Sequence, residues 1–264
     1  MPDDESIVIK PREFSADLLL PENADELEKF MDDPLPAIAE AITGAMAAGP
    51  KNWMVMGGRI VQAMLKGKLF QQVSQEIKDL REKGKIPDDF ADEKKYKYGA
   101  KSWVELFRII DEETPDADRL EALKAMFYGV NKVSASDGER IVNYQLFQIA
   151  KKLTSGELLL LRAVFESYQN SDFNPSGSVS LQQWATKVAN RLGHGLIALV
   201  LKDERALMEH QLISSWINSS QLPPHEQTVW AANARLTDLG IRFCKAIQTY
   251  QVEAKPDSNE ENGR

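Results

Sequence analysis

Apolar residues recur at three- and four-residue intervals through much of the chain, which is the period of an amphipathic helix. Three such faces follow one another in the middle of the sequence: Leu120, Leu123, Phe127 and Val130; Ile141, Tyr144 and Phe147; and Leu158, Leu161, Val164, Phe165 and Tyr168. Faces of this kind are buried by packing against one another. We therefore expect a mainly α protein, a multi-helix bundle with a winged-helix-like unit at its C-terminal end.

Polar residues indicate where several of these helices begin. A Ser, Thr or Asn followed three residues later by Glu or Gln is typical of a capping box. This pattern occurs at Asn23, Ser102, Thr154 and Ser180. The dipeptide Asp137-Gly138 predicts a turn before the next helix, and Thr114-Pro115 places a proline in the first turn of another.

Changes in composition divide the chain into five parts. We expect a flexible arm, an N-terminal helical region, a polar linker, a helical core with a winged-helix-like end, and a charged, disordered tail. The corresponding residues are 1–22, 23–81, 82–101, 102–252 and 253–264. Within the second part, the pattern predicts helices over 36–48 and 53–80.

The winged-helix-like end is inferred from the order of its elements. Leu207 to Ile213 has the pattern of a helix, and a polar, strand-prone stretch follows it. The segment from Ala234 to Ile247 is typical of a short strand that turns sharply into a capped helix. Natural proteins use small units with this order to bind nucleic acid or another protein.

Three sequence features in a fixed order together resemble the Abi-alpha family. They are a helical stretch from Glu105 to Val130, a second stretch from Tyr144 to Leu161, and Leu212-Ile213 followed by the pattern Leu-Thr-x-x-Gly-x-x-Phe at 236–243. The resemblance covers about residues 102–250. The chain departs from the family at 214–234, where it has a long polar insert with Pro223-Pro224. The resemblance implies a bacterial defence context linked to abortive infection, and the family offers no catalytic residues to transfer.

The charge of the chain bears on its partners. A formal net charge of −8 opposes broad attraction to phosphate backbones, so any contact with nucleic acid needs a local basic patch. One candidate interleaves cations with aromatic rings: Lys94, Lys95, Tyr96, Lys97 and Tyr98. Four acidic residues precede this strip and cancel its charge. It is either a solvated segment or a contact for the phosphates of nucleic acid or anionic lipid.

A second candidate site follows the residue order of a calcium-binding loop. The oxygen-bearing positions are Asp172, Asn174, Ser176, Ser178, Ser180 and Gln183. The last position has a neutral amide where calcium needs a bidentate carboxylate. The favoured interpretation is a turn whose Ser180 and Gln183 cap the next helix, and a weak calcium site is the alternative.

The remaining sequence offers no recognisable catalytic chemistry. The three histidines lack metal-site spacing, and no phosphate loop, nucleophile elbow or dinucleotide fingerprint occurs. Cys244, the sole cysteine, lies among apolar neighbours, which predicts an inert thiol. We expect no enzymatic activity and no cofactor. The acidic N-terminus lacks the order of a secretory signal, so we expect a cytoplasmic protein.

We therefore expect a non-enzymatic bacterial interaction protein that binds a protein partner in phage defence. One alternative is a DNA-binding regulator that uses the winged-helix-like unit. Another is a membrane-active effector that inserts a helical hairpin over residues 37–70, where small residues would allow close helix packing. Four basic residues interrupt that hairpin, so an ordinary spanning helix is not expected there.

Overall fold

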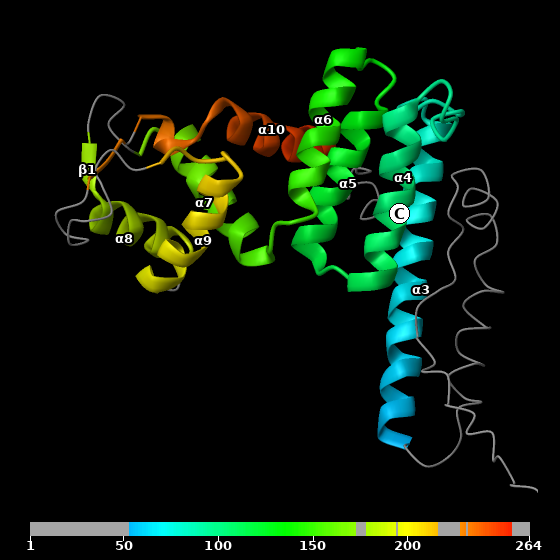
Figure 1. Cartoon of the computed structure of the whole chain (residues 1–264), viewed down its shortest axis with the longest axis horizontal. Coiled ribbons are helices and arrows are strands. Elements are labelled where there is room, and N and C mark those ends of the chain that lie inside the picture. Colours follow the sequence, from blue (N-terminus) through cyan, green and yellow to red (C-terminus); the bar gives the residue numbers. More distant parts are fainter. Residues whose placement is uncertain (1–52, 173–177, 194, 216–227, 231, 255–264) are drawn as a thin grey trace, which may run out of the picture. The chain divides into compact units, whose positions relative to one another are not determined.

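The computed structural model describes residues 53–172, 178–193, 195–215, 228–230 and 232–254, with most of their side chains from Met64 onward. This part of the chain is mainly helical, as the apolar periodicity predicts, and it contains eight α-helices and a two-stranded sheet (Figure 1). The arm expected at 1–22 and the helices expected after Asn23 and over 36–48 lie outside the described residues.

The chain forms two compact units. Among the described residues, the first contains 53–78 together with Phe107–Thr114, and the second contains Asp79–Leu106 together with those from Pro115 onward. In the first unit, α3 (Trp53–Glu82) packs on the last turns of α4 (Lys97–Glu113). The ring centroids of Phe70 and Phe107 lie 4.8 Å apart, and a buried ion pair joins Lys66 Nζ to Asp111 Oδ1 at 3.3 Å. The extent of α3 confirms the helix predicted over 53–80.

The segment 82–101 differs from the expected polar linker, because it is part of the second unit. Ile86 and Phe90 are buried, and the Phe90 ring lies 5.1 Å from that of Trp103 and 5.8 Å from that of Phe127. From Lys97 the segment already forms the first turn of α4. Average polarity suggested a linker, but two widely spaced apolar side chains are enough to hold this segment on the core.

A helical hairpin and the C-terminal helix form one half of the second unit. Five residues join α5 (Ala117–Asn131) to α6 (Asp137–Ala150), and α10 (Asp238–Glu253) packs on α5. Glu253 accepts hydrogen bonds from Tyr128 Oη at 2.8 Å and from Lys132 Nζ at 2.9 Å. This residue therefore ends a docked helix and does not begin a tail, whereas residues 255–264 lie outside the described part.

The other half of the second unit alternates helices with short strands. Its elements follow in the order α7 (Ser155–Gln169), β1 (Ser178–Ser180), α8 (Leu181–Arg191), α9 (Ile197–Glu209), β2 (Thr228–Trp230) and the 3₁₀ turn η2 (Ala232–Arg235). Strands β1 and β2 pair antiparallel with Val179 opposite Val229. The helix expected at 207–213 is wrong in its bounds, because Gln211 adopts a left-handed φ of 57° after α9 and Ile213 forms an isolated bridge with Leu236.

The structure confirms two of the predicted helix caps and contradicts another. Thr154 and Ser180 form complete capping boxes at the starts of α7 and α8. Ser136 forms a further capping box that was not predicted, because Asp137-Gly138 begins α6 and is not a turn ahead of it. The box expected at Ser102 is absent: this residue lies inside α4, where its hydroxyl donates to the Gly99 carbonyl at 2.8 Å. Pro115 precedes the cap of α5.

A buried ion pair connects α9 to the turn before α10. Arg235 and Glu204 are both fully buried, with Nη1 of the arginine 2.5 Å from Oε1 of the glutamate. The guanidinium also donates to the Ser214 carbonyl at 2.7 Å and stacks over the ring of Trp184 on α8 at 5.0 Å. Arg235 is the last of three consecutive residues with left-handed φ angles, which are costly for residues other than glycine.

The first turn of α10 is shaped by a threonine and a glycine. Thr237 Oγ1 accepts a hydrogen bond from Gly240 N at 3.0 Å and donates one to the Gln211 carbonyl at 2.6 Å. A Cβ added at Gly240 would lie 2.0 Å from the Leu212 carbonyl oxygen. The Leu-Thr-x-x-Gly pattern thus has a physical basis, because the chain segments meet too closely for any other residue at position 240.

Loss of one partner of the buried ion pair should destabilise the protein strongly. R235M leaves the Glu204 carboxylate buried without its counter-ion, which costs roughly 3–5 kcal/mol of unfolding free energy. The matched control is R162M, because Arg162 forms an exposed ion pair with Glu166 and should cost less than about 1 kcal/mol. Urea unfolding followed by circular dichroism measures both, and equal costs would contradict the assigned role of the pair.

Substitution of Gly240 should be far more damaging than the same change at another glycine. G240A forces backbone atoms apart and should cost about 3 kcal/mol or more. G138A is the control, since a Cβ at that position meets nothing within 4 Å and the change should stabilise by about 0.4–1 kcal/mol. Thermal unfolding of the two variants tests this contrast, which fails if G240A is tolerated.

Candidate functional site

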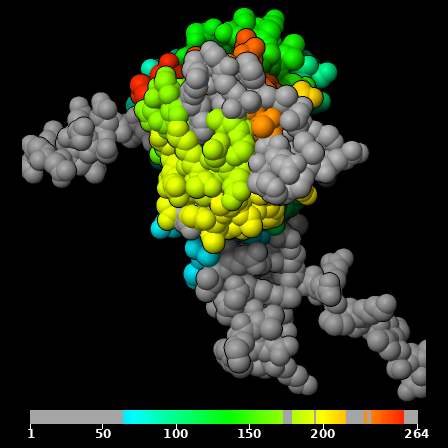
Figure 2. Space-filling model, turned by 90° about the vertical axis from the view of Figure 1, so that its left-hand side faces the viewer, coloured from blue at the N-terminus to red at the C-terminus, as the bar shows by residue number. Residues whose placement is uncertain are grey.

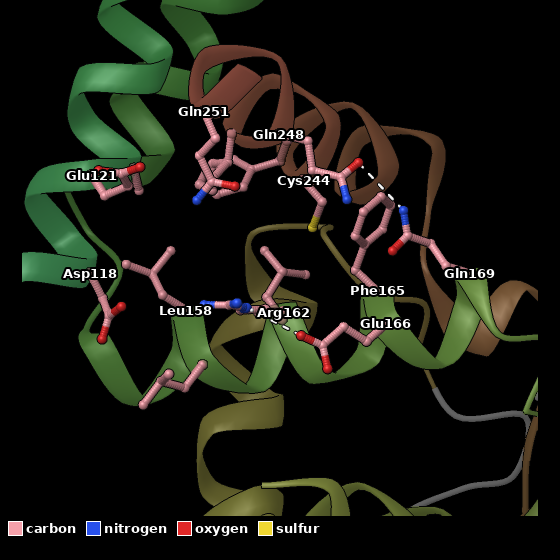
Figure 3. A pocket seen from close by; sticks show the side chains of 15 residues that line it. Asp118, Glu121, Leu158, Arg162, Phe165, Glu166, Gln169, Cys244, Gln248 and Gln251 are labelled. Carbon is pink, nitrogen blue, oxygen red and sulfur yellow. Dashed lines mark hydrogen bonds and ion pairs between the residues drawn. The ribbon is translucent and has the colours of Figure 1, made fainter. Parts of the chain in front are cut away.

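An apolar groove lies between α5, α7 and α10 in the second unit (Figure 3). Its cavity volume is about 210 Å³. The floor residues come from successive turns of α7 and α10: Leu158, Leu161, Phe165, Phe243, Cys244 and Ile247. Both helices direct an apolar stripe towards α5, and space remains where α5 and α10 contribute the small side chains of Ala122 and Cys244.

The rim of this groove is polar and mostly acidic or neutral. Its members are Asp118 and Glu121 from α5, Arg162, Glu166 and Gln169 from α7, and Gln248 and Gln251 from α10. Arg162 Nε lies 3.2 Å from Glu166 Oε1, and Gln169 Nε2 donates to Gln248 Oε1 at 3.4 Å (Figure 3). The amide groups and carboxylates can hydrogen-bond a ligand, while the floor accepts apolar surface.

The thiol in the groove floor is not arranged as a nucleophile. Cys244 is 6% exposed, and burial raises its pKa to about 12. A thiol with such a pKa stays protonated near neutral pH, whereas a reactive cysteine needs a lowered pKa. The groove is therefore better suited to binding than to covalent chemistry.

A second groove of opposite charge lies on the other side of α10. Its cavity volume is about 300 Å³, and its lining includes Lys132, Arg242 and Lys245 but only one carboxylate, that of Glu139. Hydrogen bonds from Ser136 hold the pKa of Glu139 below its ordinary value. Helix α10 thus separates an acidic groove from a basic one.

Glu105, expected to belong to a helix cap, is the centre of a hydrogen-bond cluster. It accepts hydrogen bonds from Tyr144 Oη at 2.9 Å, Gln148 Nε2 at 2.8 Å and Lys151 Nζ at 2.6 Å. Burial favours the neutral carboxyl, but the three donors outweigh it and lower the pKa of Glu105. The cluster joins α4 to α6, and its donors occupy the carboxylate.

The predicted basic strip separates into an inward and an outward part. The Tyr96 ring lies beneath Arg140 at 4.9 Å, and the Tyr98 ring packs 5.1 Å from that of Tyr144. The side chains of Lys94, Lys95 and Lys97 are all exposed, and Lys95 Nζ pairs with Asp89 Oδ2 at 2.5 Å. Contact of these lysines with phosphates stays a prediction.

The structure describes only part of the predicted calcium loop, since residues 173–177 lie outside the described residues. The Asp172 carboxylate pairs with Arg191, and Lys187 Nζ donates to the Asp172 carbonyl. Ser180 and Gln183 form the capping box of α8, as the favoured interpretation requires. Ser178 lies in β1, and Asn174 and Ser176 lie outside the described residues. The two cations already beside Asp172 argue against calcium, and no group of three His, Cys, Asp or Glu residues in the described part could hold a metal ion.

The groove itself was not predicted from the sequence. Its floor residues on α7 were correctly expected to point inward, but periodicity alone does not show where three helices leave a space. The available signal was a pair of small residues, Ala122 and Cys244, on faces otherwise made of bulky side chains. That signal gains meaning only once α5 and α10 are known to pack together.

Cys244 should react with a thiol reagent far more slowly in the native protein than in the unfolded one. The raised pKa and low exposure together should reduce the rate with dithionitrobenzoate at pH 8 on the order of 100-fold or more. The signal is unambiguous, because the chain has one cysteine. Native protein that reacts as fast as a free cysteine would show that the groove floor is open and the thiol acidic.

None of the described helices is both long and apolar enough to cross a membrane, and residues 37–52 of the predicted hairpin lie outside the described part. Comparisons of the chain with protein-family models, curated proteins and solved structures gave no match.

Proposed function

We propose that this chain is a non-catalytic bacterial interaction protein that binds a protein partner in phage defence, the context that the Abi-alpha resemblance implies. The binding surface in this proposal is the exposed start of α9. One observation carries it: Leu196 and Leu199 are 54% and 45% exposed there, and Ala198 between them is exposed as well. An exposed apolar cluster of this kind is typical of a surface that another protein covers.

The element order supports a winged-helix-like unit built on a helical bundle. Helices α7, α8 and α9, with β1 before α8 and its antiparallel partner β2 after α9, follow the order of such a unit. Gly193 and Gly195 adopt left-handed φ angles between α8 and α9, which allows the tight connection of a helix-turn-helix. Helices α8 and α9 lie side by side on one face of the unit (Figure 2). Helices α5, α6 and α10 supply the bundle.

The chemistry of α9 favours a protein partner over DNA. A helix that reads bases presents side chains able to hydrogen-bond to base edges. The exposed first turn of α9 instead presents aliphatic groups, and in later turns the cations Lys202 and Arg205 are accompanied by Asp203 and Glu209. A net charge of −8 also opposes broad electrostatic attraction to DNA.

A DNA-binding regulator is the second candidate, because the helix-turn-helix order itself favours it.

A membrane-active effector is the third candidate, and the side chains that favour it lie on α3 in the first unit. Met64 and Leu65 are 55% and 52% exposed on α3, in the same turn in which Lys66 is buried against Asp111. Leakage of dye from anionic vesicles on addition of the protein would favour this third candidate.

The surface of α9 should be required for partner capture. Extracts of phage-infected and uninfected bacteria are passed over immobilised wild-type chain, L196D/L199D and I141D, and retained proteins are identified by mass spectrometry. Ile141 is 43% exposed on α6, so I141D is the matched control for an added charge. We expect a protein retained by the wild type and by I141D but lost from L196D/L199D.

A separate binding measurement on the unmodified chain distinguishes the proposal from DNA binding. The chain should not shift the fluorescence anisotropy of a labelled duplex, even at about 50 mM salt, where phosphate contacts are strongest. Duplex binding that weakens steeply with salt, or turnover of nucleotides by the purified chain, would refute the proposed function.

A further inference from the structure

The acidic groove between α5, α7 and α10 has the dimensions of an anchor pocket. Small-molecule sites usually enclose about 300–1,000 Å³, and this cavity is smaller, at about 210 Å³. Pockets that hold one bulky side chain of a protein partner are compact, apolar and surrounded by polar residues. The floor of Leu158, Phe165 and Cys244 with its polar rim has this construction, and Leu159, 42% exposed at the edge, extends the apolar area.

The charge of the rim specifies what should flank the anchoring side chain. The lining contains three carboxylates, Asp118, Glu121 and Glu166, and one guanidinium, that of Arg162. Glu166 is paired with Arg162 and Arg191, and Glu121 lies 3.9 Å from Lys124 Nζ, whereas Asp118 is exposed at the start of α5. A cationic residue beside the anchor would approach Asp118 at the α5 end. The amides of Gln248 and Gln251 at the α10 side can donate to and accept from a polar chain.

We propose that this groove binds an amphipathic helix of a partner protein that carries a bulky apolar anchor with Lys or Arg one turn away. The basic groove across α10 would repel the same helix, so the two sides of α10 discriminate by charge. This site is separate from the α9 surface, and the proposal does not depend on the function assigned to that surface.

The probe is a synthetic helical peptide of about 16 residues, long enough to retain helicity, with Trp and Leu on one face and Lys beside them. The control peptide has Glu in place of each Lys. Both carry a fluorescent label, and anisotropy titration with the full chain gives Kd. We expect the Lys peptide to bind at least about tenfold more tightly than the Glu peptide, with the difference reduced by salt.

Two variants locate the binding. C244L fills the groove floor, and D118K reverses the charge of the exposed carboxylate at the α5 end of the rim; each should weaken binding of the Lys peptide at least about tenfold. The matched control R242E/K245E alters the other groove and should leave Kd unchanged. If C244L does not fold, the rim variant still decides the question, since Asp118 is exposed.

Equal affinity for the two peptides, no binding of either, or loss of binding in R242E/K245E would overturn the proposal. The L196D/L199D variant separates it from the proposed function. Wild-type affinity for the Lys peptide in that variant supports an independent groove site, and a loss there as large as in D118K would place the peptide on α9 and overturn the groove assignment.

Discussion

The ion pair between Arg235 and Glu204 constrains the C-terminal half of this protein, because both charges are buried and several elements meet at it. Two charges at nearly zero exposure are tolerated only when each neutralises the other, because removal from water is costly. The pair joins α9 to η2, and the cation also packs on Trp184 of α8. Three consecutive left-handed residues persist at this point, since surrounding contacts over-determine their conformation.

The direction of α10 follows from that anchor. The Thr237 cap and the close approach of Gly240 to Leu212 fix the first turn of the helix, and Glu253 fixes its end through Tyr128 and Lys132. Held in this way across α5, the helix has one groove on the side toward α7 and another on the side toward α6. Tyr128 and Lys132, which fix the end of α10 through Glu253, also line the second groove.

The sequence predicted the local features and missed the non-local ones. The helix periods and the caps at Thr154 and Ser180 involve residues within one or two turns, so neighbouring sequence determines them. The burial of Phe90, the Arg235–Glu204 pair and the groove all join residues far apart in the chain. Ser102 does not cap α4 because the helix already begins at Lys97. A match to the capping-box motif takes no account of whether the preceding residues are helical.

The carboxylates of the second unit also support binding as the chemistry available to it. General acid and base catalysts work best with a pKa near the operating pH. Here hydrogen bonds to Glu105, Asp116 and Glu253 hold each pKa below its ordinary value, and burial raises the pKa of the Cys244 thiol. Each of these groups is stabilised in one protonation state by a structural partner or by the core. Groups committed in this way fix the positions of helices, and in the proposed function the surfaces between those helices recognise a partner.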